Sequence, residues 1–375
     1  MASYEQKRKL ENIETLISNA EKTFSAQFRR ELPDTIENIA KKYATRRKNP
    51  YISDAIKPEI KELMLDYRLT DENYLKTLLY IAHDLFREKP TNANKKAFIV
   101  AAQTGAGKTA LRTQILREYP GAIVINYDLF KKYRPDCEKI REINPAYFGA
   151  LTGIDSYDHG SDIMDMALDL GYDILIESAP SSRDGLVNVN LEKMARAGYD
   201  LDFNILAVGD LVSALGVHIR YEQAIIENLP DAKLTDLARH NDSYNALEKI
   251  VEDFSDKNLI RVYRRGTEEE NRVPQQIICP EGRELEALRE ERKRSNFEYA
   301  SMEKGRDKSN FERDYLYVLS MMENRQFSNT ELGQIKKVYS QYEHFCLDNS
   351  VLYTSRSSKK KDFNDSGTPG GGDVR

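Results

Sequence analysis

Seven consecutive residues carry the clearest chemical signal in this sequence, because they form a short loop of small residues that ends in lysine and threonine. They are Gln103, Thr104, Gly105, Ala106, Gly107, Lys108 and Thr109. Glycines let the backbone curl until several N–H groups point at one anion, and a following helix adds its positive end. Lys108 would add a point charge at the β- and γ-phosphates, and the hydroxyl of Thr109 is a ligand for Mg²⁺. The pattern predicts a binding site for a nucleoside triphosphate.

The flanking sequence has the character that such a phosphate loop requires. The short apolar run 97–101 predicts a buried strand before the loop, and residues 110–118 have helical periodicity after it. The common pattern has a glycine five places before Gly107, where this chain has Ala102, so the entrance to the loop has less backbone freedom. A chance match to the motif is the alternative, and the predicted strand and helix argue against it.

Further apolar runs predict a parallel sheet around this loop. They follow the first strand at residues 122–126, 174–177, 203–208 and 259–263, with helical patterns between them. Strands that alternate with helices from 97 to 265 favour an α/β fold in three layers, with helices on both faces of a parallel sheet. In such folds the ligand crevice lies beyond the carboxyl ends of the strands.

Two acids and two arginines follow these strands and are candidates for the chemistry of the site. Asp128 comes just after the second strand, either as a base that orients an attacking hydroxyl or as a carboxylate that caps the turn into the next helix. Glu177 ends the third strand, in the manner of a Walker B acid that orients Mg²⁺. Arg183 lies in the loop that follows, and Arg220 lies in a helical pattern, as a cation of the site or as an ordinary salt-bridging residue.

The composition limits the classes of function. The 375 residues carry a formal net charge of −5, which gives no reason to expect nucleic acid or an anionic membrane as a partner. No apolar run is long enough to cross a bilayer, and the first residues contain no apolar signal region. The three cysteines, like the histidines, lack the spacing of a metal site, and they lack a disulfide framework. We therefore expect a cytoplasmic protein with no nucleic-acid and no membrane partner.

Charged helical regions flank the predicted sheet on both sides. We divide the chain into a helical N-terminal extension at 1–95, a core at 96–267, a charged helical region at 268–355 and a disordered tail at 356–375. The N-terminal extension is either a docking or regulatory module or a packing element with no separate role.

The core resembles the zeta toxin family, the P-loop small-molecule kinases of bacterial toxin–antitoxin systems. The resemblance covers about residues 95–267 and rests on several segments in the same order. They are the phosphate loop with the Ala-Leu-Arg that follows it, Ile-Val-Ile-Asn-Tyr-Asp-Leu-Phe-Lys at 123–131, Gly-Tyr-Asp-Ile-Leu-Ile-Glu at 171–177 and Ile-Arg-Tyr-Glu at 219–222. The resemblance implies a three-layer P-loop kinase-like parallel sheet with helical N- and C-terminal extensions.

The resemblance also implies an activity and its cofactors. Members of the family use ATP or GTP with Mg²⁺ to phosphorylate the 3′-hydroxyl of the amino sugar in UDP-N-acetylglucosamine, a sugar nucleotide. It implies that Asp128 accepts the proton of the sugar hydroxyl, that Lys108 handles the phosphates and that Thr109 handles the metal. Arg220 is similar to the arginine that steadies the transferring phosphoryl group.

The same resemblance assigns residues to the substrate. Glu177 is similar to the family's substrate-binding acid, and Lys233 stands where a second arginine of the family is expected, with Arg239 as its rival. The family's Gly-Thr-Gly-Arg after the acid is replaced here by Ser-Ala-Pro-Ser at 178–181, with Arg183 displaced along the chain.

Other functions stay open at this point. A different P-loop kinase would act on an antibiotic or a nucleoside, and a nucleotide-gated binding protein would use its flanking helices to engage a partner. The N-terminal helices would also be able to inhibit the core within the same chain, in the place that a separate antitoxin occupies in the family.

Overall fold

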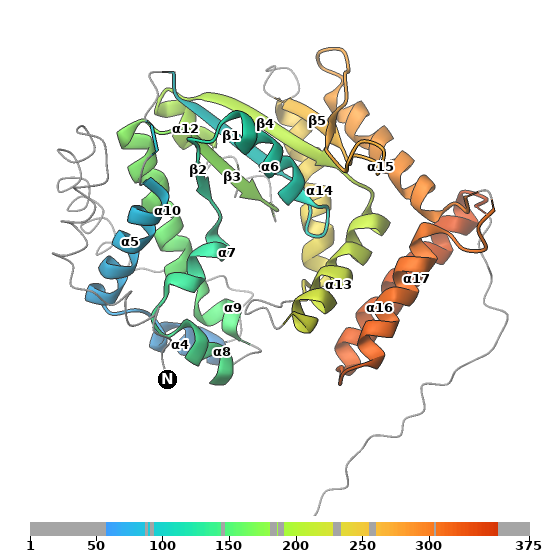
Figure 1. Cartoon of the computed structure of the whole chain (residues 1–375), viewed down its shortest axis with the longest axis horizontal. Helices are drawn as coiled ribbons and strands as arrows, with labels where there is room; N and C mark the ends of the chain where they lie inside the picture. The colour runs from blue at the N-terminus through green and yellow to red at the C-terminus, as the bar shows by residue number, and fades with distance from the viewer. Residues whose placement is uncertain are drawn as a thin grey trace, which may run out of the picture.

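The structure is a computed structural model, and it describes residues 58–351 except 87–88, 91–93, 144–146, 181–185, 187–190, 228–233, 255–259 and 304. Among these described residues, six strands form one sheet in the order β2-β3-β1-β4-β5-β6 (Figure 1). The strands are β1 (Lys96–Ala101), β2 (Ile123–Ile125), β3 (Ile174–Ser178), β4 (Asp200–Ala207), β5 (Ile260–Arg264) and β6 (Gln275–Gln276). The first five are parallel to one another, as predicted, and β6 pairs antiparallel with β5.

Helices precede, separate and follow the strands. They are α4 (Pro58–Asp66), α5 (Asp71–Phe86), α6 (Lys108–Glu118), α7 (Tyr127–Phe130), the 3₁₀ helix η1 (Lys131–Tyr133), α8 (Cys137–Ile143), α9 (Phe148–Leu151), α10 (Gly153–Leu170), α12 (Glu192–Arg196), α13 (Asp210–Ile226), α14 (Leu237–Phe254), α15 (Glu284–Ala300), α16 (Asn310–Glu323) and α17 (Asn329–Asp348). None of the helices in the described part of the chain is long and apolar enough to span a bilayer.

Alternate residues of β1 face two separate cores, which is why the sheet is the middle of three layers. Ala97, Ile99 and Ala101 join a buried cluster with side chains of α5, α10, α12 and α14. Phe98 and Val100 join a second cluster, which includes side chains of α6 and α13. Successive side chains of a strand point to opposite faces, so a strand that is apolar throughout must be covered on both. The three-layer α/β architecture is confirmed.

Helix α5 is one of the helices that cover the sheet. The hydroxyl of Thr70 caps it by accepting a hydrogen bond from the backbone N–H of Asn73 at 3.3 Å. The Tyr74 ring stacks on His159 of α10 with ring centroids 3.9 Å apart, and the Tyr74 hydroxyl donates to Asp162 at 2.5 Å. Leu78, Ile81 and Phe86 belong to the same buried cluster as the strands. Residues 1–57 of the predicted N-terminal extension lie outside the described residues.

The C-terminal helices pack on α13, at the end of the molecule opposite α4, α5 and α10 (Figure 1). Their buried side chains form one cluster with Leu211, Ala214 and Leu215 of α13. The sequence pattern predicted a charged helical region over 268–355, and the structure divides it into α15, α16 and α17. Helices α16 and α17 each begin with a capping box, built by Ser309 and Glu312 in α16 and by their counterparts at 328 and 331 in α17.

Candidate functional site

The loop between β1 and α6 has the curled backbone that a phosphate loop needs. Gly105 and Gly107 have φ angles of 81° and 87°, in the left-handed region that favours glycine. Helix α6 begins at Lys108, and no side chain caps its first turn. The start of this helix therefore presents backbone N–H groups and the positive end of its dipole to a ligand.

The Lys108 side chain folds back over its own loop. Its Nζ donates to the carbonyl oxygens of Ala102 and Gln103, at 3.0 and 3.1 Å. Burial lowers the pKa of Lys108 to about 8; the nearby charges of Arg220 and Arg239 lower it as well, while Glu177 raises it. The amine is thus positioned above the loop among other cations, and an anion bound there would restore its full charge.

Glu177 lies at the end of β3 and is paired with an arginine that sequence reasoning did not assign to the site. Arg112 Nη1 donates to Glu177 Oε2 at 2.8 Å, and both side chains are largely buried. Arg112 stands four residues after Lys108 on α6, which puts the two side chains on one face of the helix. That spacing is the signal that could have identified it. Because this ion pair balances the charge of Glu177, the residue is a weaker candidate for a metal ligand than its comparison with a Walker B acid suggested.

Asp128 and Lys108 emerge at the same edge of the sheet. Asp128 follows β2 and Lys108 follows β1, and β3 with its Glu177 lies between those two strands. Adjacent strands are about 4.8 Å apart, so the two strand ends are separated by roughly 10 Å. The cap of α7 is Asn126, whose side chain accepts a hydrogen bond from the backbone N–H of Asp128 at 3.1 Å. Capping of this turn by Asp128, one of the two interpretations of that carboxylate, is therefore wrong.

The carboxylate of Asp128 is itself exposed and paired. Its side chain is 77% exposed, and Oδ1 lies 2.5 Å from Nζ of Lys131 on the next turn. A carboxylate in this position is accessible to a substrate. Its role as a base stays a prediction.

Arg239 lies close to the end of β3. One of its guanidinium nitrogens, Nη2, donates to the carbonyl of Ala179, in the segment that follows Glu177. Arg220 is exposed on α13. With Lys108 and Arg112, these arginines give the carboxyl edge of the sheet an excess of positive charge, which suits a polyphosphate ligand. Arg183 and Lys233, the other predicted substrate residues, lie outside the described residues.

The amide of Gln103 ties the phosphate loop to the helices behind it. Its Nε2 donates to the carbonyl of Val208 at 2.7 Å and to Oγ of Ser213 at 3.0 Å. Ser213 Oγ in turn lies 2.9 Å from Nε2 of His240 on α14, and burial lowers the pKa of His240. Gln103 is fully buried, so its side chain supports the loop from behind, and its predicted role in nucleotide binding stays a prediction.

Thr109 is the residue of the loop that is suited to a metal ion. It is exposed in the first turn of α6, and its hydroxyl is a hard oxygen ligand of the kind that Mg²⁺ prefers. In the part of the chain that the structure describes, no group of three or more His, Cys, Asp or Glu side chains is arranged to hold a metal. The residues present therefore fit a Mg²⁺ ion that is held chiefly by the phosphates and by Thr109.

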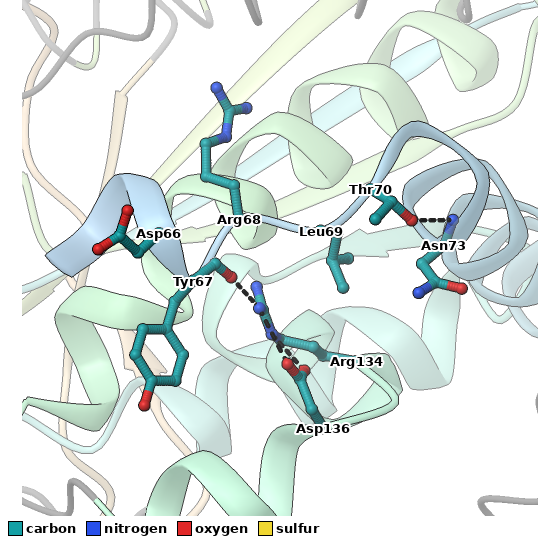
Figure 2. A pocket seen from close by; sticks show the side chains of 8 residues that line it. All are labelled: Asp66, Tyr67, Arg68, Leu69, Thr70, Asn73, Arg134 and Asp136. Carbon is teal, nitrogen blue, oxygen red and sulfur yellow. Dashed lines mark hydrogen bonds and ion pairs between the residues drawn. The ribbon is translucent and has the colours of Figure 1, made fainter. Parts of the chain in front are cut away.

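Two cavities lie away from this edge. One, of about 330 Å³, lies between the α4–α5 turn and the segment after η1, and Figure 2 shows its lining. Arg134 donates there to the carbonyl of Tyr67 and to Asp136, and beyond the cavity to Asp155. These contacts already occupy the guanidinium, so the cavity is a structural junction of the two segments rather than a second anion site. The other, of about 520 Å³, lies between residues 277–280 and α15.

The part of the chain that holds this candidate site is similar to known proteins. The sequence model of the zeta toxin family matches residues 82–271, which contain β1 to β5 and the candidate site. A toxin zeta of Streptococcus pyogenes is 27% identical over 210 residues, which cover 52% of this chain and 69% of that protein. The toxin PezT of Streptococcus pneumoniae serotype 4 is 26% identical over 208 residues, which cover 52% of this chain and 79% of that protein.

A solved structure has the same fold. It is a chain of the PezAT chromosomal toxin–antitoxin system of Streptococcus pneumoniae, which superposes with a TM-score of 0.53 at 17% sequence identity. The superposition covers 69% of this chain and 98% of that chain.

Proposed function

Since the chain belongs to the zeta toxin family, we propose that it is a kinase that transfers the γ-phosphoryl group of ATP to a hydroxyl group of a sugar nucleotide. The 3′-hydroxyl of the amino sugar of UDP-N-acetylglucosamine is the acceptor that we expect. The observation that carries the proposal is that Lys108 and Asp128 lie at the same edge of the sheet. A cluster of positively charged side chains around Glu177 lies between them. A phosphate cradle, a carboxylate for the nucleophile and cations for the equatorial oxygens are what phosphoryl transfer needs.

The donor half of the site holds the triphosphate. Backbone N–H groups of the loop and the start of α6 bind the phosphates, and Lys108 releases its contacts with Ala102 and Gln103 to reach them. Mg²⁺, when bound next to Thr109, neutralises charge on the phosphate oxygens. Arg220 adds positive charge for the equatorial oxygens of the transferring group.

The acceptor half brings the sugar hydroxyl to the phosphoryl group. Asp128 accepts the hydroxyl proton as the oxygen attacks, a contribution of typically about 10²–10⁴-fold in rate for a positioned base. Glu177 and Arg239 bind the sugar nucleotide, and we expect Arg183 and Lys233, which lie outside the described residues, to contribute to this binding. Arg112 holds the Glu177 carboxylate in a fixed orientation.

One experiment tests the reaction. The protein is incubated with ATP and Mg²⁺, with GTP in parallel, together with a panel of UDP-sugars, and the products are identified by mass. We expect ATP to be consumed only when an acceptor is present and the acceptor to gain one phosphoryl group. Tight ATP binding with no transfer to any sugar nucleotide would instead favour a nucleotide-gated binding protein, and transfer to an antibiotic or nucleoside would favour another kinase.

We propose further that the protein acts as a toxin that an antitoxin neutralises, which the family and the PezAT structure support. Inhibition by the chain's own N-terminal residues is the alternative. Because α5 is part of the core, the informative deletion removes residues 1–57 and keeps α4 and α5. Unchanged kinase activity and growth toxicity after this deletion would exclude inhibition by those residues.

A further inference from the structure

The side chain of Arg265, just after β5, reaches the outer face of the phosphate loop. Its Nε donates to the carbonyl oxygen of Ala106 at 2.9 Å, and its Nη2 donates to the carbonyl oxygen of Gly105 at 2.8 Å. A Cβ atom on Gly107 would lie 3.5 Å from both nitrogens. One guanidinium group therefore contacts three successive residues of the loop.

The contacts of Arg265 with the loop affect how the loop is oriented for nucleotide binding. In a phosphate loop the peptide N–H groups converge on the anion, so the carbonyl groups of the same peptides point the other way. Arg265 binds two of these outward carbonyls with a planar fork, which fixes the orientation of the peptides that follow Gly105 and Ala106. Because these peptides are already held in this orientation, the nucleotide does not have to order them when it binds, and its affinity is higher for that reason.

A tyrosine and an aspartate of the C-terminal helices lie near the guanidinium. The Tyr299 hydroxyl of α15 donates to Asp314 Oδ2 of α16 at 2.5 Å. Burial of its charged end lowers the pKa of Arg265, and the nearby Asp314 carboxylate raises it. Neither residue belongs to the segment that matches the family, which ends at residue 271.

We propose that Arg265 is a positioning residue for the phosphate loop, and that it holds two outward carbonyl groups of the loop in the orientation that nucleotide binding needs. The inference deepens the proposed function and rests on it, because it concerns the same nucleotide site.

The test uses two substitutions in the full chain, Arg265→Lys and Arg265→Met. Lysine keeps the charge but cannot span two carbonyls, and methionine has neither the charge nor the donors. We therefore expect both variants to weaken ATP binding by about tenfold, which corresponds to about 1.4 kcal/mol. ATP affinity is measured by calorimetry with Mg²⁺ present. The KM for ATP should rise by the same factor, while the KM for the acceptor stays unchanged and kcat changes less. A general loss of structure would not produce this division between the two substrates.

Arg261→Met is the matched control. Arg261 lies on β5, the strand that precedes Arg265; it is 52% exposed and pairs with Asp202 at 2.6 Å, away from the loop. We expect ATP binding to stay at the parent value in this variant. Should either Arg265 variant fail to fold, Arg265→Gln tests the same contact, because its side-chain amide is too short to span both carbonyls, and the expected loss in ATP affinity is again about tenfold.

The outcomes separate this inference from the proposed function. Arg265→Lys and Arg265→Met variants that bind ATP as tightly as the parent would overturn the role of Arg265, whichever acceptor the kinase uses. A parent chain that binds ATP and is weakened by these changes, but transfers phosphate to no sugar nucleotide, supports the role of Arg265 and removes the kinase assignment. A parent chain that does not bind ATP overturns both.

Discussion

Gly216 of α13 lies directly against Gly105 of the phosphate loop. A Cβ atom at position 216 would lie 2.6 Å from the carbonyl oxygen of Gly105, and one at position 105 would lie 2.0 Å from that of Ser213. Real Cβ atoms do not approach other atoms so closely, so the two backbones touch where neither carries a side chain. Because α13 also packs on the C-terminal helices, the loop is held between the sheet and a helix that those helices position.

The contact between the two glycines predicts the effect of one methyl group. Gly216→Ala must push α13 away from the loop, and we expect it to weaken ATP binding by about tenfold and to lower the free energy of unfolding by about 1–3 kcal/mol. Calorimetry with ATP and urea unfolding measure the two effects.

Gly333→Ala is the control for this change. A Cβ atom at position 333 in α17 would meet nothing within 4 Å, so the substitution should leave ATP binding unchanged and raise stability by about 0.5–1 kcal/mol through helix propensity. ATP binding at the parent level in Gly216→Ala would show that the loop does not depend on α13.

Lys108 predicts how ATP affinity depends on pH. Its pKa in the free protein is lowered to about 8, mainly by burial, whereas bound phosphates favour the charged amine. Above pH 8 the free protein holds the neutral amine, so ATP binding must take up a proton and its affinity falls as the pH rises. We expect a loss of about tenfold between pH 7 and pH 9, measured by calorimetry.

The variant Lys108→Met isolates this effect. It should bind ATP more weakly than the parent at pH 7, and its affinity should change little over the same range of pH. If the parent itself showed no loss of affinity up to pH 9, the amine would not be the group that binds the phosphates.

Asp128 is the candidate base, and its replacement by asparagine removes the ability to accept a proton with little change in shape. We expect Asp128→Asn to lower the rate of transfer by about 10²–10⁴-fold, while ATP binds with unchanged affinity. Product formation by mass and calorimetry with ATP give the two readings. Undiminished transfer in this variant would remove Asp128 from the mechanism.

Asp136→Asn provides the comparison for Asp128. Asp136 also follows β2 and pairs with an arginine, Arg134 at 2.6 Å, but it lines the cavity beside the α4–α5 turn instead of the sheet edge. This variant should transfer phosphate at close to the parent rate.

Most of the sheet could be predicted from the sequence because each parallel strand is an apolar run between turn residues. The edge strand β6 could not, because Gln275 and Gln276 are two polar residues with no apolar pattern. The division between α16 and α17 has a local signal in the sequence, because Ser328 and Glu331 have the spacing of a capping box within the predicted charged helical region.

The site divides in the same way into local and distant features. The phosphate loop is contiguous in sequence, so its residues could be found together. Arg112 lies one helical turn from Lys108 and was also within reach of sequence reasoning. Arg265 was not, because it contacts Ala106 across 159 residues of chain, and the contact depends on the order β1-β4-β5 in the sheet.

His159 predicts a loss of stability in mild acid. It is fully enclosed between α5 and α10, its ring stacks on Tyr74 and its Nε2 lies 3.0 Å from the Tyr74 carbonyl oxygen. Burial lowers its pKa to about 3; the hydrogen bond to Tyr74 opposes the shift and the charge of Arg134 adds to it. The unfolded chain takes up a proton at this histidine near pH 6.5 and the folded chain does not, so its contribution to stability falls as the pH drops below 6.5.

The expected loss is about 2 kcal/mol between pH 7.5 and pH 5, from this histidine alone. Other groups titrate in this range, so the measurement is the difference between the parent and His159→Phe, which keeps an aromatic ring against Tyr74 and has no proton to gain. Urea unfolding at both pH values should show a fall in the free energy of unfolding that is about 2 kcal/mol larger in the parent. His344→Phe, at an exposed position of α17, should keep the pH dependence of the parent. An equal pH dependence in the parent and in His159→Phe would mean that the histidine is charged in the folded protein, and that α5 does not close over it as the stacking on Tyr74 requires.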